Sequence, residues 1–130
     1  MKNTVLLRFS LALILLMHSV PSLLTGDVNG FGEYYLNSAG FAPLGIYLAW
    51  AVKLTHLFSA VFLALNKYLK IISCFNILIF IMGIILIHGS EGWYVVGGGR
   101  NGVEFNFLLI VCFLSLAFPD GFLIKKKNIL

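Results

Sequence analysis

Charged residues are scarce in this chain: they make up 11% of its 130 residues, about half the fraction usual in a water-soluble domain. Together with 60% hydrophobic residues and a mean hydropathy of +0.98, this scarcity excludes a soluble catalytic domain and indicates a membrane protein. Acidic residues number only five, and no two of them stand at a spacing that suggests hydrolysis. A chain of this length has room for one domain, which we expect to cover residues 1–130.

Cysteine is also scarce, with only Cys74 and Cys112. Both fall inside long apolar runs, where we expect them to act as small apolar side chains rather than as a redox pair. No Ser-His-Asp or Cys-His arrangement can be read, and no two-His or His/carboxylate spacing repeats a known set of metal ligands. The sequence therefore predicts no conventional hydrolase and no metal site, and it leaves open whether the protein is an enzyme.

Long apolar runs are what the chain has in abundance. A hydrocarbon core of roughly 30 Å needs about 20 helical residues at about 1.5 Å each, and four runs reach or approach this length. We therefore predict an all-α fold, an integral membrane bundle of four transmembrane helices in the lipid bilayer. The predicted spans cover residues 4–24, 44–65, 71–87 and 100–118, the last one beginning inside a glycine-rich stretch.

The basic residues predict how these helices are oriented. Apart from Lys53, which falls inside the second span, only Arg100 lies on one side of a four-span chain, and the other basic residues lie on the opposite side. These are Lys2, Arg8, Lys67, Lys70, Lys125, Lys126 and Lys127. The positive-inside rule then puts the N-terminus and the C-terminus in the cytoplasm and the loops 25–43 and 89–102 outside. Because membrane orientation explains the net charge of +4, we expect no nucleic-acid partner.

Two N-terminal segments each allow two interpretations. Residues 1–26 could be a secretory signal, but no small-x-small cleavage site follows and the apolar run continues to Leu24, which favours a retained helix. The loop 25–43 mixes aromatic and polar residues and could form a short interfacial helix or a plain surface loop. Both alternatives stay open for this loop.

Five ionisable residues in or near the predicted spans are the first candidates for a site, because such groups are costly inside a membrane and usually face the bundle interior. They are His18, Lys53, His56, His88 and Glu104. Their depths predict a polar cluster in the outer half of the bundle, with an ion pair between Lys53 and Glu104. A structural role is equally compatible, since Lys53 can extend outward, Glu104 can cap the fourth helix and the histidines can join neighbouring helices.

The glycine-rich run 97–102 superficially resembles a phosphate-binding loop. It lacks the Gly-Lys-Ser/Thr ending and follows no predicted strand, so we interpret it as a flexible or close-packed lead into the fourth helix. Arg100 within it is a candidate contact for an anionic group.

Three segments share one family's pattern. The first is Leu7-Arg8 with residues 18–23, HSVPSL, at the end of the first run. The second is residues 88–105, which begin with His-Gly and finish with Gly-Val-Glu-Phe, and the third is the region around Lys53. They resemble the DoxX family of small four-helix bacterial membrane proteins, which open with Leu-Arg, end the first span with His-Gly-x-x-Lys and begin the fourth with Gly-x-Glu-aromatic.

The chain departs from the family's pattern in two places. Ser19 and Ser22 stand where the family has Gly and Lys, and Lys53 stands where the family often has an acidic residue, with His56 and Leu57 at the two glycines that follow it. The resemblance implies an integral protein of the bacterial inner membrane, some of whose relatives are associated with quinone-linked oxidoreductase complexes.

Three functional hypotheses follow. The resemblance implies a subunit working with a quinone-linked redox system, with quinone as the cofactor and membrane redox subunits as partners. A transporter-like bundle would instead use Lys53 and His56 to line a polar path. The third hypothesis is a purely structural or assembly protein that packs against its partners.

Overall fold

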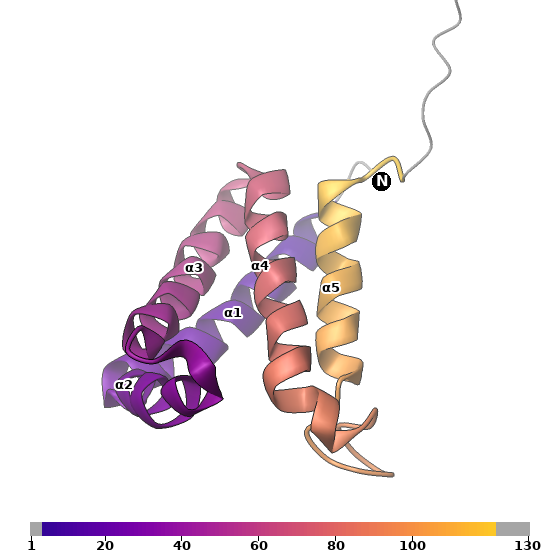
Figure 1. Cartoon of the computed structure of the whole chain (residues 1–130). Helices are drawn as coiled ribbons and strands as arrows, with labels where there is room; N and C mark the ends of the chain where they lie inside the picture. The colour runs from indigo at the N-terminus through magenta and orange to yellow at the C-terminus, as the bar shows by residue number, and fades with distance from the viewer. Residues whose placement is uncertain (1–3, 122–130) are drawn as a thin grey trace, which may run out of the picture.

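The structure is a computed structural model that describes residues 4–121, and every regular element in this range is helical (Figure 1). In chain order the elements are α1 (Val5–Thr25), α2 (Asp27–Gly30), η1 (Phe31–Phe41), α3 (Gly45–Leu65), α4 (Leu69–Gly83), η2 (Ile84–His88), η3 (Gly89–Glu91) and α5 (Glu104–Ala117). The all-α prediction is confirmed for the described residues.

Three of the helices are long and apolar enough to cross a membrane. They are α1 and α3, with 21 residues each, and the continuous helical stretch Leu69–Glu91, with 23 residues. Their mean hydropathies are 1.7, 1.7 and 2.5. These helices indicate a membrane-spanning protein, and they coincide with the first three predicted spans.

The fourth helix differs from its prediction, because α5 begins at Glu104 and has 14 residues. Residues 92–103 instead fold back on themselves: the amide of Gly102 donates to the carbonyl of Tyr94 at 3.0 Å and that of Glu104 to the carbonyl of Trp93 at 3.0 Å. Asn101, with φ of 60°, adopts the left-handed conformation, which interrupts a right-handed helix. The predicted start near Arg100 is therefore wrong.

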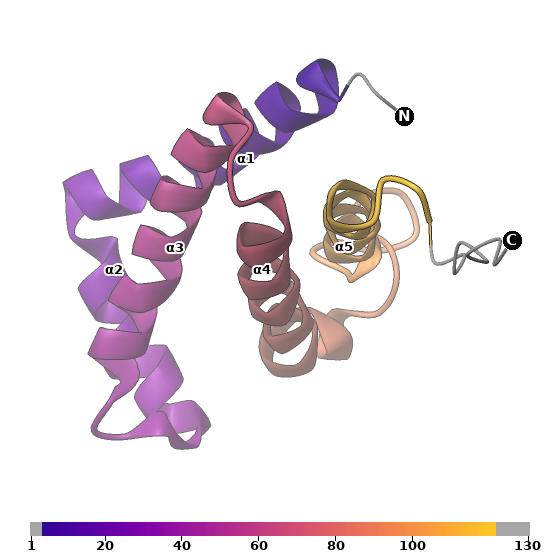
Figure 2. The same ribbon diagram turned by 90° about the horizontal axis from the view of Figure 1, so that it is seen from above.

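The helices form two antiparallel pairs around one apolar core. α1 packs on α3 and α5 packs on α4, while contacts between α3 and α4 join the pairs (Figures 1 and 2). All four long elements contribute to the core. Its buried residues are Leu11, Ala12, Leu15, Ala60, Leu63, Ile72, Phe80, Leu109, Phe113 and Leu116. If residues 1–26 were a cleaved secretory signal, the core would lose Leu11, Ala12 and Leu15.

The bundle has two distinct ends. We call one the turn end, because the tight turn 66–68 between α3 and α4 lies there beside the start of α1 and the end of α5 (Figure 1). Asn66 ends α3 with φ of 56°, a conformation that asparagine tolerates well, and the amide of Lys67 donates to the carbonyl of Phe62 at 3.0 Å. We call the opposite end, with α2, η1 and the loop 92–103, the loop end.

At the loop end, the segment 25–43 is largely helical rather than a plain loop. It packs tightly on α3, because Gly32 and Gly45 bring the two backbones together: a Cβ atom on Gly32 would lie 2.5 Å from the Cα of Ile46. The side-chain oxygen of Asn37 accepts a hydrogen bond of 2.9 Å from the amide of Gly45. Val28 is fully buried here, so this segment forms a second, smaller core against α3.

Candidate functional site

Three of the five predicted site residues come together on the seam between α1 and α3. Lys53 and His56 are three residues apart and so share one face of α3. The Lys53 ammonium donates a hydrogen bond of 2.7 Å to the backbone carbonyl of His18, and the rings of His18 and His56 lie 5.3 Å apart. His18 is exposed, Lys53 is half-buried and His56 is only 1% exposed, so the group leads from the surface to the interior.

The lysine contact lies next to a proline of α1. Pro21 lies inside α1 and has no N–H, so the carbonyl of Met17, four residues earlier, loses its usual helical donor. The next two carbonyls along the helix accept from side chains: Lys53 donates to His18, and the hydroxyl of Ser22 donates to the carbonyl of Ser19 at 3.0 Å. The charged group inside the span is thereby partnered, as an intramembrane charge requires.

His56 has no such partner. Its ring lies between that of His18 and that of Phe80, which stacks on it at 5.8 Å with 27° between the planes. Among residues 4–121, no atom forms a hydrogen bond with either ring nitrogen. A buried polar group without a partner costs about 1–3 kcal/mol, so a histidine kept only for packing would be poorly placed here. The unpaired nitrogens are suited to hydrogen-bonding a ligand.

His88 lies at the loop end, close enough to His18 for the two rings to interact electrostatically. Its Nδ1 lies 2.7 Å from the carbonyl oxygen of Asn101, so the ring ties the end of η2 to the loop 92–103. Beside it, Asn106 of α5 donates to the carbonyl of Phe80 at 3.5 Å. A Cβ atom on Gly83 would lie 3.1 Å from the Asn106 amide nitrogen and 3.9 Å from the His88 ring. Asn106 therefore joins α5 to α4 near Gly83, through the backbone of Phe80.

Glu104 does not meet Lys53, and the predicted ion pair is wrong. The Glu104 carboxylate accepts a hydrogen bond of 2.8 Å from the amide of Val95 and so holds the loop 92–103 against the start of α5. The physical reason is helix pairing: Lys53 lies on the seam between α1 and α3, whereas α5 packs on α4. The sequence analysis did not identify which helices are neighbours.

This separation makes a testable prediction. In a double-mutant cycle of Lys53→Met and Glu104→Gln, we expect the two losses of unfolding free energy to add within about 0.5 kcal/mol, because the residues share no partner. Thermal unfolding in mild detergent measures the effect. If Glu104→Gln restored the unfolding free energy that Lys53→Met loses, the result would support an ion pair between the two residues.

The loop 92–103 is close-packed rather than open. A Cβ atom on Gly102 would lie 2.5 Å from the carbonyl carbon of Trp93, and one on Gly98 would lie 2.9 Å from the Tyr94 ring. Arg100 lies exposed within this loop, and its role as an anion contact stays a prediction.

The sequence analysis did not select several buried polar residues as site candidates. Some of them carry no charge, and Arg8 was considered only for the orientation in the membrane and for the family resemblance. Asn76 of α4 donates to the hydroxyl of Ser59 on α3 and to the carbonyl of Ile72, both at 2.7 Å. Arg8 is 7% exposed and donates to the carbonyl of Leu63 at 2.5 Å. The signal for Asn76 was its place as the one amide side chain within the most apolar run.

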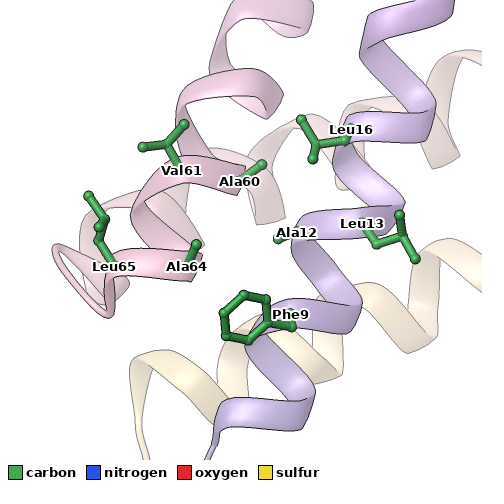
Figure 3. Close-up of a pocket in the computed structure, with 8 residues that line it drawn as sticks. All are labelled: Phe9, Ala12, Leu13, Leu16, Ala60, Val61, Ala64 and Leu65. Carbon is green, nitrogen blue, oxygen red and sulfur yellow. The ribbon is translucent and has the colours of Figure 1, made fainter.

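An apolar groove follows the same seam toward the turn end. It has a volume of about 440 Å³ and is lined by Phe9, Ala12, Leu13, Leu16, Ala60, Val61, Ala64 and Leu65 (Figure 3). Figure 3 shows the alanines facing the space between the helices, with the ring of Phe9 and the side chain of Leu16 near its two ends. Ala60 and Lys53 are seven residues apart and so lie on one stripe of α3, which connects the groove with the polar group above it.

Metal and thiol chemistry have little support in the described residues. No group of three or more His, Cys, Asp or Glu side chains gathers within residues 4–121. Cys74 is exposed and Cys112 is half-buried, and both are free thiols.

The chain shows no similarity to a known protein: no protein-family model, no curated protein and no solved structure matches it.

Proposed function

We propose that this chain is a DoxX-like integral protein of the bacterial inner membrane that binds a quinone headgroup between α1 and α3, as a subunit of a quinone-linked redox system. The observation that carries the proposal is His56, whose two ring nitrogens are buried without a partner in the described chain, next to His18 and the Lys53 ammonium. The choice of quinone as the ligand rests on the resemblance to the DoxX family.

The residues present fit such a headgroup. Quinone carbonyl oxygens are acceptors, and the seam offers an ammonium and imidazole N–H groups as donors. The exposed ring of His18 gives access from the side of the bundle, and Phe80 supplies an aromatic face behind His56. A bound quinone would supply two-electron redox chemistry. The side chains would orient its oxygens and hold protons next to them.

The apolar groove supports the same ligand. Ligand sites in proteins are mostly apolar, with a few polar groups that set orientation. The groove has no charged residue in its lining and continues the seam from the polar group toward the turn end. It would hold the apolar tail of a molecule whose head lies at Lys53.

The distribution of charge supports the proposed orientation. Lys67 and Lys70 lie at the turn end with Asp120, whereas Arg100 and four acidic residues, Asp27, Glu33, Glu91 and Glu104, lie at the loop end. By the positive-inside rule the turn end, and with it both termini, faces the cytoplasm. Lys2 and residues 125–127, which also enter the prediction, lie outside the described residues.

The first experiment is purification in mild detergent after native expression, with mass spectrometry of the copurifying proteins and lipids and an absorption spectrum. We expect quinone and redox subunits to remain bound. A colourless protein without quinone or partners would overturn the proposal and favour a transporter-like or structural role.

A binding measurement then tests the residues. We expect Lys53→Met to weaken binding of a short-chain quinone analogue at least about tenfold, because a hydrogen bond to a charged group contributes about 1.5–3 kcal/mol. Lys70→Met is the matched control, since it removes an exposed lysine at the turn end. Equal affinities for both variants and the wild type would contradict the assignment of the headgroup to this seam.

A further inference from the structure

The inner faces of α3 and α4 carry polar groups at successive turns. On α3 these are His56, Ser59 and, one turn further, the backbone carbonyl of Leu63 that Arg8 contacts. On α4, Ser73 and Asn76 are three residues apart and so share a face. The 2.7 Å hydrogen bond between Asn76 and Ser59 brings the two faces together.

Side-chain contacts place these groups at three successive levels along the bundle, counted from the loop end toward the turn end. His56 stacks on Phe80 at the level of the proposed quinone site, Asn76 bonds Ser59 about one turn lower, and Arg8 lies about one turn below that, near the turn end. One helical turn rises about 5.4 Å. The levels therefore follow each other at roughly constant spacing down the interior of the bundle.

Each level holds a buried polar atom without a partner among residues 4–121. These atoms are both ring nitrogens of His56, the side-chain oxygen of Asn76, the hydroxyl oxygen of Ser73 and the Nε of Arg8. All four residues are less than 9% exposed. Polar groups buried in this way normally bond to other protein groups or to ordered water.

We infer that a row of bound water molecules bonds to these atoms, including one ring nitrogen of His56, and connects His56 with the aqueous phase at the turn end. A water molecule that bonds two groups at about 2.8 Å each, at its near-tetrahedral angle, bridges about 4.5 Å, which matches the rise of the three helical residues from His56 to Ser59. The Arg8 Nε donates to water, and the Asn76 oxygen accepts from it.

The row gives His56 a supply of protons from the turn end. A neutral imidazole accepts a proton at one ring nitrogen and releases one from the other, so no other group is consumed. This inference goes beyond the proposed quinone site and does not require it, because the water positions lie on α3, α4 and Arg8 rather than at Lys53. Loss of quinone binding and loss of the water row are therefore separate outcomes.

Water-edited solid-state NMR of the full chain in lipid bilayers tests the row. In the wild-type protein, we expect the side-chain nitrogens of His56 and Asn76 to receive magnetisation from water several-fold faster than the buried ring of Phe113. Transfer to all three at the same slow rate would overturn the inference without any variant.

Variants test the route by which water arrives. Asn76→Leu should slow transfer to His56 several-fold, whereas Asn106→Leu, the same substitution near the start of α5 and outside the proposed row, should leave it unchanged. Ser73→Ala provides a smaller change if the leucine variant folds poorly, and its effect on His56 should have the same sign. Unchanged transfer in both Asn76→Leu and Ser73→Ala would mean that water reaches His56 past His18, and would reject the row.

Discussion

Replacing Gly32 by alanine is expected to lower the free energy of unfolding by about 3 kcal/mol or more and to remove most of the folded protein. The new Cβ atom would lie 2.5 Å from the Cα and 2.7 Å from the amide nitrogen of Ile46. Both are backbone atoms in the first turn of α3, so no side-chain rotation can relieve the overlap. The yield of monodisperse protein and its thermal unfolding in detergent measure the effect.

Gly30 offers a matched control only two residues away. A Cβ atom there would meet only the ring of Tyr34, at 3.9 Å, and its φ of −59° is ordinary for a helix. Gly30→Ala should therefore be neutral or stabilising by up to about 1 kcal/mol. Equal damage by the two substitutions would show that segment 25–43 tolerates no alanine for a reason other than contact with α3.

The second large effect is expected from Arg8→Gln. The Arg8 guanidinium donates to the carbonyls of Leu63 and Ala64, at 2.5 and 3.3 Å, and so partners the last turn of α3 from α1. Its loss leaves buried carbonyl oxygens with fewer donors, and we expect a destabilisation of about 2–3 kcal/mol. Thermal unfolding followed by helical circular dichroism measures the change.

Arg100→Gln is the control for this variant, because Arg100 lies exposed in the loop 92–103. We expect its midpoint of unfolding to match the wild type. If Arg8→Gln unfolds at the same temperature as Arg100→Gln, the buried arginine contributes nothing to the contact between α1 and α3, and its charge would serve membrane orientation alone.

The limits of the first two spans could be predicted because abrupt changes in polarity mark them, whereas the third, predicted as 71–87, extends over Leu69–Glu91. The predicted starts at residues 4 and 44 lie one residue from those of α1 and α3, since polar or glycine residues flank both runs. The start of α5 could not be predicted in this way. It depends on backbone hydrogen bonds within the loop 92–103 and on the left-handed conformation of Asn101, neither of which changes hydropathy.

The candidate site could be predicted only in part, for a related reason. Hydropathy identifies charged groups inside apolar runs, and this was sufficient to select His18, Lys53 and His56. It does not say which helices are neighbours, so Glu104 was assigned to Lys53 although it lies on the other helix pair. Uncharged groups such as Asn76 barely alter the mean hydropathy of a run, and only the packed structure shows that they are buried.

The short length of α5 has a consequence for the surrounding lipid. Its 14 residues rise about 21 Å, about 9 Å less than a typical hydrocarbon core, whereas the stretch Leu69–Glu91 beside it rises about 35 Å. If α5 crosses the bilayer as the proposed fourth span, the hydrocarbon layer must be thinner along it than along its neighbour. Such a mismatch costs a fraction of a kcal/mol per Å.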